Sequence, residues 1–370
     1  MKIATLNIEN LYHRDKSLIR KDPSKCVSDW VSELDSLIPR IRKSENEMDR
    51  IRELSFLLGF GKFNKGLYGV LRKRQGNLYL KLGDVGKEMK ASELTDWNGW
   101  IALSTVDIDK RSTYNKAKLI AESDADIILL QEVEDRSSLV DFNNTYLRES
   151  NILPYEQVMV LEGNDSRGLS LGIMLKNGYR LDSVKSHGIY TALGTGPLFD
   201  IDCQEYGIRT PKGENLYILS MQFSADDPAK RKFQAGKVSA IYEKMRADGK
   251  DLILVCGTLN DTSFGDSLSP IFDRTDLVDV CKHPTFKTET ETGKGAGYFS
   301  LGAYGMGVNI RQKDHLLPSY DMADKMTASG LDRRAMWPDR NSNWTLFPSL
   351  KNKDQEASSH PLIWRTFDIG

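Results

Sequence analysis

The sequence has little cysteine, no hydrophobic run of membrane-spanning length and almost no net charge. Its four cysteines, Cys26, Cys203, Cys256 and Cys281, are widely spaced and include no Cys-x-x-Cys pair, which argues against a zinc site. Cys256 lies inside an apolar run, so we expect it to be a small buried core residue. Because no apolar run approaches about 18 residues, we expect no transmembrane segment.

The sequence as given also opens without the basic segment, hydrophobic segment and cleavage site of a secretory signal, so we expect a cytoplasmic protein or a mature product. The formal net charge of −1 provides no overall positive field that would attract nucleic acid. Binding to nucleic acid would therefore depend on a local basic patch.

The length predicts one domain that carries an insertion. At 370 residues the chain exceeds a typical single domain, although compact units reach about 250 residues before insertions are counted. Residues 30–41 and 48–58 carry apolar side chains at helical spacing, and the short segments 67–71 and 78–82 are typical of a hairpin. We therefore expect a single domain, residues 1–370, interrupted by a mainly helical insertion at about 15–110.

Part of this insertion is basic. From Arg40 to Arg74 there are ten basic and four acidic residues, a net charge of +6, interspersed with Phe63 and Tyr68. This composition is compatible with nucleic-acid contact through phosphate charges and base stacking. The alternative is a solvated helix face with mixed ion pairs.

Three apolar runs far apart in the sequence each end in an oxygen-bearing side chain. They are Met1–Asn7, Asp126–Glu132 and Leu252–Asn260. Continuous apolar runs of this length are typical of strands buried on both faces. We expect these strands to bring their terminal polar side chains to one edge of a sheet.

The remaining pattern predicts more strands than helices. We expect further strands at 156–161, 169–175, 215–222, 314–317 and 362–367, helices at 114–123 and 228–246, and a methionine-rich loop at 320–347. Because long crossovers alternate with short turns, a layered α/β fold (α+β type) with mixed sheets fits better than a doubly wound parallel sheet.

Five polar residues at the predicted strand ends form a candidate site: Asn7, Glu132, Asn260, Asp314 and His360. A carboxylate and an amide oxygen are suitable ligands for Mg²⁺, whose remaining ligands are water and phosphate oxygens. A histidine held by an aspartate can stabilise or protonate an oxyanion. Together these groups predict metal-assisted hydrolysis of a phosphoester.

Several sequence motifs are similar to those of a known protein family. They are IATLNIEN, ADIILLQEVED, GNDSRGLSLGIM, RKFQAGKVSAIYE, ILVCGTLNDT, KDHLLPS and SSHPLIWRTF, in this order. With these motifs the chain resembles the endonuclease/exonuclease/phosphatase superfamily with its DNase I-like fold, and in particular a bacterial branch with a large insertion after the first strand. The resemblance implies a four-layer sandwich of two mixed β-sheets flanked by helices.

The resemblance also implies roles for individual residues. Asn7 and Glu132 would hold Mg²⁺ or Mn²⁺, Asn260 would contact the scissile phosphate, and Asp314 and His360 would form a catalytic pair. Arg167, in the Gly-rich turn, is the candidate substrate-binding residue. The implied function is a divalent-metal-dependent phosphodiesterase or endonuclease that acts on nucleic acid, with a small phosphoester as an open alternative.

The chain departs from the family pattern at three positions. Gln222 replaces a histidine, Thr258 replaces a carboxylate that would position water or protonate the leaving group, and Ser359 replaces an aspartate. Removal of such an acid commonly lowers the rate about 10²–10⁴-fold. We therefore expect impaired or altered activity. The alternative is a catalytically inactive family member that binds nucleic acid or a protein partner.

Structural alternatives exist for most of these residues. Asn7 and Asn260 also suit turns, and Asp314 with His360 could be a purely structural pair. We expect His315 to be a packed core histidine. Arg333, Arg334 and Trp337, in the methionine-rich loop, either contact a substrate groove or are solvated.

Overall fold

The computed structural model describes residues 1–15, 27–40, 42–60, 69–75, 98–103, 105–150, 153–165, 168–191, 196–288, 312–338 and 344–369. The chain divides into two compact units. One consists of Met1–Tyr12 and Ile108–Gly370, and the other of His13–Asp107.

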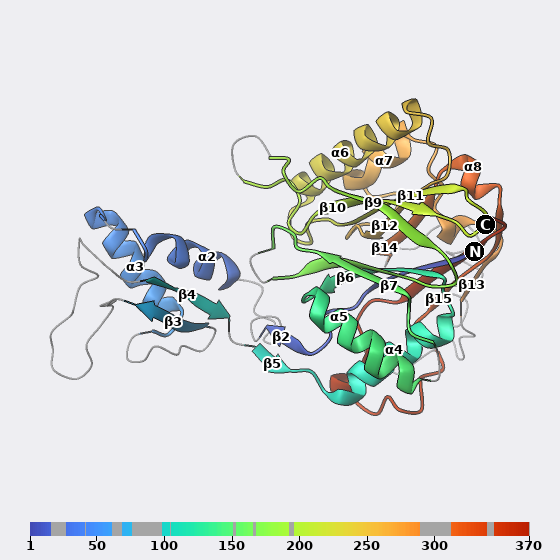
Figure 1. The fold of residues 1–370 in the computed structure, drawn as a ribbon. Helices are drawn as coiled ribbons and strands as arrows, with labels where there is room; N and C mark the ends of the chain where they lie inside the picture. Colours follow the sequence, from blue (N-terminus) through green and yellow to red (C-terminus); the bar gives the residue numbers. More distant parts are fainter. Residues whose placement is uncertain are drawn as a thin grey trace. The chain divides into compact units, whose positions relative to one another are not determined.

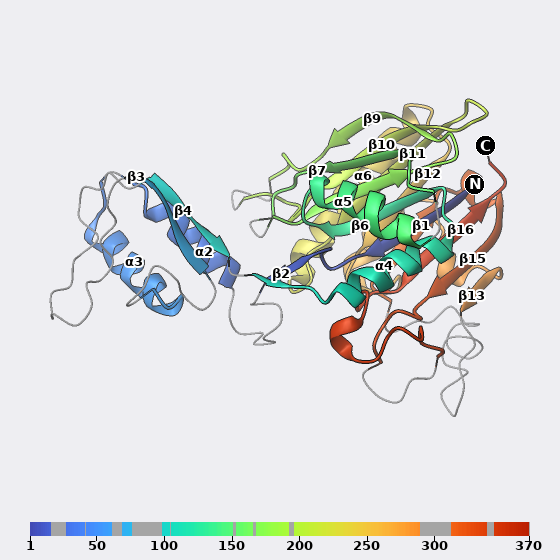
Figure 2. The same ribbon diagram turned by 60° about the horizontal axis from the view of Figure 1, so that its bottom comes forward.

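A seven-stranded mixed sheet forms one half of the first unit (Figures 1 and 2). Its strands are β1 (Lys2–Asn7), β6 (Ile127–Val133), β7 (Gln157–Leu161), β8 (Ser170–Leu175), β13 (Phe286–Thr288), β15 (Met326–Asp332) and β16 (Leu362–Phe367). Their order is β13-β15-β16-β1-β6-β8-β7. The neighbours β1 and β6 run parallel, and β16 and β8 flank them in antiparallel directions.

A five-stranded mixed sheet forms the other half of this unit. Its strands are β9 (Arg180–Ser186), β10 (Cys203–Arg209), β11 (Asn215–Gln222), β12 (Ile253–Thr258) and β14 (Asp314–Pro318). Their order is β14-β12-β11-β10-β9. Strands β11 and β12 are parallel, and the other pairs are antiparallel.

The apolar runs are continuous because both faces of each central strand are covered. Successive strand residues point to opposite faces of the sheet. In β6, Ile127 and Leu129 therefore join the core between the two sheets, where they pack with Ile218 and Leu254 of the other sheet. Leu130 points the other way and joins a second core under the helices.

Helices cover both outer faces (Figure 1). The outer face of the seven-stranded sheet packs against α4 (Lys110–Ser123), α5 (Arg136–Phe142) and the π-helical turn η1 (Asn143–Leu147). The outer face of the five-stranded sheet packs against α6 (Pro228–Ala247) and α7 (Ser269–Arg274). The first unit therefore has four layers, and the predicted α/β sandwich of two mixed sheets is confirmed.

Short elements complete the first unit: η2 (Asp266–Leu268), η3 (Val280–Lys282), α8 (Tyr320–Ala323) and η4 (Lys353–Gln355).

Cys256 is fully buried and has a free thiol, as expected. Among the helices that the structure describes, none has both the length and the apolar character needed to cross a bilayer.

The second unit contains two helices and two small sheets. Helix α2 (Val27–Leu37) and helix α3 (Glu45–Leu57) pack their apolar side chains together, and strand β3 (Gly69–Gln75) pairs with β4 (Asn98–Leu103). Strands β2 (His13–Asp15) and β5 (Thr105–Asp107) pair at its two chain ends. Ser44 and Glu47 form a reciprocal capping box that starts α3.

One prediction about elements was wrong, and another stays a prediction. The hairpin expected between 67–71 and 78–82 stays a prediction because residues 78–82 lie outside the described part; β3 pairs with β4, where Ile101 is buried against the helices. The expected loop at 320–347 contains strand β15, whose buried Ser329 and neighbouring Gly330 gave no apolar signal. Its pairing with β16 and β13 sets its conformation, so tertiary context overrides local pattern here.

Candidate functional site

The polar residues at the strand ends meet at one edge of the sandwich. Strand β1 ends at Asn7, β11 at Gln222 and β12 at Thr258. Strand β14 begins at Asp314, which pairs with Thr258 in the antiparallel ladder. Strand β16 is antiparallel to β1, so His360, just before β16, lies at the edge where β1 ends.

Glu132 reaches this edge through a β-bulge in β6. The pairing of β6 with β8 shifts register between Leu130 and Val133, and Glu132 has a left-handed φ of 60°. A bulge re-aims a side chain and ends regular pairing, and a non-glycine residue at positive φ stores strain. The strand was expected to end at Glu132, and it instead deforms there.

Two amides donate to the Glu132 carboxylate. The Nδ2 of Asn7 lies 3.2 Å and the Nε2 of Gln222 lies 2.8 Å from Oε1 of Glu132. The Nδ2 of Asn7 also lies 3.3 Å from the Oγ1 of Thr258. Gln222, which occupies a position where the resembled family has a histidine, thus compensates a half-buried carboxylate by hydrogen bonding.

Thr258 connects this group to an aspartate–histidine pair. Its hydroxyl donates to Oδ1 of Asp314 over 2.7 Å. The Nδ1 of His360 lies 2.8 Å from Oδ2 and 3.0 Å from Oδ1 of the same carboxylate. A continuous series of contacts therefore runs from Glu132 through Asn7, Thr258 and Asp314 to His360.

The surroundings favour the protonated form of His360. Burial alone would lower the pKa of the imidazole, but the Asp314 carboxylate, its hydrogen bond and the nearby Glu9 and Glu132 raise that pKa to about 9. The side chain of His360 is 14% exposed. His360 is therefore a partly accessible cation at neutral pH, fixed by Asp314 in one orientation.

Glu9 is a site residue that the sequence pattern did not indicate. It follows Asn7 at positive φ (46°), and its carboxylate accepts hydrogen bonds from the backbone N–H (3.1 Å) and the hydroxyl (2.5 Å) of Ser359. Ser359, at another altered family position, thereby ties the loop after β1 to the segment that carries His360. The only sequence signal is an acidic residue just beyond a strand end.

The other predicted site residues are placed differently. Asn260 donates its side-chain amide to the Phe223 carbonyl and has a left-handed φ of 55°, which supports its turn interpretation. His315 is fully buried, as expected, and its Nε2 lies 2.7 Å from the Asp261 carbonyl. Arg167 lies outside the described residues.

Arg333 and Arg334, which were candidates for contact with a substrate groove, bind other residues of the fold. Arg333 is buried with its guanidinium 4.4 Å from the centre of the Trp344 ring. Arg334 forms ion pairs with Asp332 and Glu122. Both therefore support the fold, and neither is a solvated groove residue. Trp337 packs against the outer core of the seven-stranded sheet.

Glu132 and Asn7 suit a cation that has few protein ligands. In the described ranges, no group of three or more His, Cys, Asp or Glu side chains is arranged to hold a metal. Mg²⁺ commonly needs only one or two carboxylates, with water and phosphate oxygens as its other ligands. The side-chain amides of Asn7 and Gln222 donate to Glu132 and place partial positive charge beside its carboxylate. A bound cation would neutralise the same carboxylate. The Oδ1 of Asn7, the oxygen that would serve as a second ligand, accepts a hydrogen bond from the Glu9 N–H over 3.1 Å.

Much of the described positive charge in the Arg40–Arg74 stretch is paired. Arg40 pairs with Glu47, Arg50 with Glu33 and Glu53, and Arg52 with Asp49. For these residues the mixed ion-pair interpretation fits. Lys62 and Lys65 lie outside the described part, as do the side chains of residues 72–74.

No family model matches the chain, and no curated protein matches it significantly. The structure does match solved structures of endonuclease/exonuclease/phosphatase proteins. An endonuclease/exonuclease/phosphatase from Bacteroides vulgatus matches with 13% identity and a TM-score of 0.47, over 68% of this chain and 89% of that chain. The human Nocturnin catalytic domain matches with 14% identity and a TM-score of 0.47, over 70% and 87% of the two chains. Truncated TDP2 from Caenorhabditis elegans matches with 18% identity and a TM-score of 0.44, over 70% and 92%.

Proposed function

We propose that this protein is a divalent-metal-dependent phosphoester hydrolase whose site is the edge formed by Glu132, Asn7, Thr258, Asp314 and His360. The observation that carries the proposal is the unbroken series of hydrogen bonds between Glu132 and His360. In this series, the Glu132 carboxylate, which suits a hard cation, and the protonated His360 imidazole lie at one sheet edge. A phosphoryl group needs both kinds of charge, which supports the proposal.

The proposed role of His360 follows from its charge. Its imidazolium stabilises negative charge on the phosphoryl oxygens, and Asp314 holds the ring so that Nδ1 faces the carboxylate. Glu132 and Asn7 would hold the cation, which when bound would further neutralise the phosphoryl charge. Glu9 and Ser359 fix the segment that carries His360.

We further propose a slow turnover. The buried hydroxyl of Thr258 donates to Asp314 and cannot carry the negative charge of a water-activating carboxylate. Loss of a general acid or base commonly lowers the rate about 10²–10⁴-fold. The substrate class that we propose is a phosphodiester of nucleic acid, with small phosphoesters as the competing class.

A second candidate function is binding without cleavage. The observation that favours it is the pair of amides on Glu132, because Gln222 and Asn7 satisfy this carboxylate without a metal. Fluorescence anisotropy with labelled DNA and RNA at two salt concentrations tests it. Phosphate-tracking binding weakens steeply with salt, and salt-independent binding would contradict it.

Hydrolysis assays of the full chain test the first function. The substrates are bis(p-nitrophenyl) phosphate, p-nitrophenyl phosphate, plasmid DNA and single-stranded DNA and RNA, each with Mg²⁺, Mn²⁺ or a chelator. We expect cation-dependent hydrolysis that falls about 10²-fold or more in Glu132→Gln and in His360→Asn.

The matched control is Asp354→Asn, which removes an exposed carboxylate outside the site and should leave the rate unchanged. Equal cleavage by the wild type and Glu132→Gln would identify a contaminant and refute the proposal. The preferred substrate in the wild type decides between the diester and monoester classes.

A further inference from the structure

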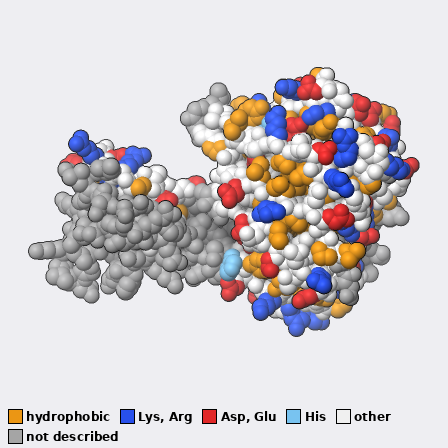
Figure 3. Space-filling view, in the orientation of Figure 1, with side chains coloured by type: hydrophobic (Ala, Val, Ile, Leu, Met, Phe, Trp, Pro, Cys, Tyr) orange, Lys and Arg blue, Asp and Glu red, His pale blue; other side chains and the backbone are white. Residues whose placement is uncertain are grey.

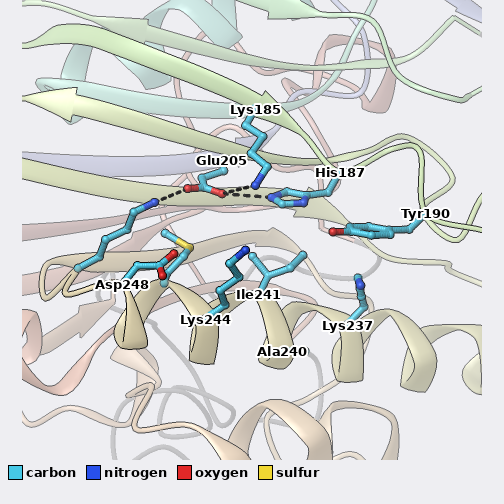
Figure 4. A pocket seen from close by; sticks show the side chains of 11 residues that line it. Lys185, His187, Tyr190, Glu205, Lys237, Ala240, Ile241, Lys244 and Asp248 are labelled. Carbon is cyan, nitrogen blue, oxygen red and sulfur yellow. Dashed lines mark hydrogen bonds and ion pairs between the residues drawn. The ribbon is translucent and has the colours of Figure 1, made fainter.

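A second cluster of charged side chains lies on the outer face of the five-stranded sheet, independent of the proposed active site. It lines a cavity of about 190 Å³ between strands β9 and β10, the turn after β9, and helix α6. Four lysines face it, against two carboxylates; they are Lys185, Lys237, Lys244 and Lys250, with Glu205 and Asp248. Figure 4 shows these side chains converging from the sheet and the helix.

The sheet side of this pocket is fixed by ion pairs. The Glu205 carboxylate lies 2.6 Å from Nζ of Lys250, 3.2 Å from Nε2 of His187 and 4.0 Å from Nζ of Lys185. The His187 hydrogen bond, together with these lysines, outweighs burial and lowers the pKa of Glu205 to about 2. His187 is 3% exposed and lines the pocket, so its imidazole is held in place by the fold.

The helix side carries the excess positive charge. Lys237 and Lys244 are seven residues apart on α6 and so lie on the same face, two turns from each other. Within the described chain, neither ammonium group has a carboxylate ion-pair partner. In Figure 4 the Lys244 amine and the Tyr190 hydroxyl point into the space below His187.

The ring of Tyr190 is already engaged. It stacks on His187 with ring centres 5.7 Å apart, and Nζ of Lys237 lies 3.5 Å from the centre of the same ring. Stacking of a nucleobase on this ring would compete with both contacts, whereas its hydroxyl is directed at the cavity. The pocket is thus equipped to recognise a compact anion rather than a base.

We propose that this pocket binds a phosphate dianion, either free phosphate or the terminal group of a phosphate monoester, with Lys237 and Lys244 as its charge partners. The cavity is smaller than the roughly 300–1,000 Å³ typical of whole drug-sized ligands and suits one phosphoryl group. A phosphodiester backbone instead requires an extended groove. Charges of both signs are interspersed over the face of this unit drawn in Figure 3, with no broad basic surface there. The proposal does not depend on the proposed hydrolase function.

Isothermal titration calorimetry of the full chain tests this site. The probes are inorganic phosphate, a 5′-mononucleotide and an oligonucleotide without a terminal phosphate, at low ionic strength. The titrations use both the wild type and His360→Asn, because the second background removes phosphate bound at the proposed active site. We expect the double substitution Lys237→Gln and Lys244→Gln to weaken phosphate and mononucleotide binding about tenfold or more in both backgrounds.

The matched control is Lys232→Gln, on the same helix but paired with Asp266 outside the pocket, which should change affinity less than about twofold. Thermal melting verifies that each variant is folded. Unchanged binding in the double variant, or an equal loss in the control, would overturn the site. Oligonucleotide binding that is as tight as mononucleotide binding, and that the double substitution weakens equally, would overturn the monoester assignment.

Discussion

At the scale of single residues, the site depends on how each polar group is compensated. His360 is charged because Asp314 is 2.8 Å away and two further carboxylates are near. Glu132 is compensated by two amides, and Thr258 joins the two halves through its hydroxyl. Each of these hydrogen bonds can be removed by its own substitution, so each gives a separate testable prediction.

The pKa of His360 predicts a pH-dependent stability. Its folded-state pKa of about 9 lies above the ordinary 6.5, so the folded state binds the proton more tightly. This contribution, up to about 3 kcal/mol, is complete below pH 6.5 and is lost as the pH rises through about 9. Urea unfolding of the wild type and His360→Asn should give a difference in free energy that shrinks over this range. A difference independent of pH, or an NMR titration of His360 near 6.5, would refute the charged pair.

Thr258→Val removes the hydroxyl and keeps the shape of the side chain. Asp314 then loses a donor and Asn7 loses an acceptor in a buried setting, so unfolding should require about 1–3 kcal/mol less free energy. Thr327→Val, at an exposed position, is the control and should change stability by less than about 0.5 kcal/mol. Equal effects of the two substitutions would mean that the Thr258 contacts contribute nothing.

At the scale of elements, two backbone distortions bring the strand ends together. Glu132 sits in the bulge of β6, and Gly257 in β12 has a φ of 131° beside Met221 of β11. A side chain at Gly257 would place its Cβ 1.9 Å from the Met221 carbonyl oxygen. The close parallel approach of β11 and β12, which positions Gln222 beside Thr258, therefore requires glycine.

Gly257→Ala should consequently destabilise the protein by about 4 kcal/mol or more, because backbone has to move in a buried sheet. Gly249→Ala is the matched control: its φ is also positive (78°), but nothing lies within 4 Å of the added Cβ. It should lower stability by only about 1–2 kcal/mol. Chemical unfolding of both variants measures the contrast, and similar losses would show that the contact with Met221 is unimportant.

The sequence pattern predicted the helices and strands that have a local signal. It missed strand β15, whose conformation is set by partner strands distant in the sequence. The apolar runs ending in Asn7 and Glu132 and the strands 215–222 and 362–367 were predicted because burial on both faces leaves a continuous hydrophobic pattern. Strand β15 was missed because its small and polar residues are explained only by its neighbours.

The same division holds within the site. The convergence of Asn7, Glu132, Asp314 and His360 was predictable from strand ends. The contact of Glu9 with Ser359 was not, because the Glu9 side chain joins residues 350 positions apart. The placement of Gln222 on Glu132 likewise depends on the juxtaposition of two sheets, which no local pattern encodes.

At the scale of the whole molecule, the first unit is built from both ends of the chain. The N-terminal amine donates to the Phe367 carbonyl over 3.0 Å, and the Ile108 N–H donates to the Tyr12 carbonyl over 2.8 Å. The chain therefore leaves and re-enters this unit at adjacent backbone positions. Such a geometry is compatible with the proposed insertion, since a short linker can close the gap.

Replacement of His13–Asp107 by a short Gly-Ser linker should leave the first unit folded, with a melting temperature within about 5 °C of the full chain. Hydrolysis of a small phosphodiester should persist, because the proposed site residues all belong to the first unit. Circular dichroism and the small-substrate assay measure both properties. An unfolded deletion variant would contradict the single-domain-with-insertion interpretation.

The proposed hydrolase function requires that one sheet edge hold a cation and a phosphoryl group together. The most direct measurement is anomalous diffraction from crystals of the full chain soaked with Mn²⁺ and inorganic phosphate. We expect a manganese peak at coordination distance, about 2.0–2.2 Å, from the Glu132 carboxylate. This peak should be absent in Glu132→Gln, and phosphate should lie within hydrogen-bond distance of His360. Manganese bound only elsewhere, or the absence of phosphate beside His360, would contradict it.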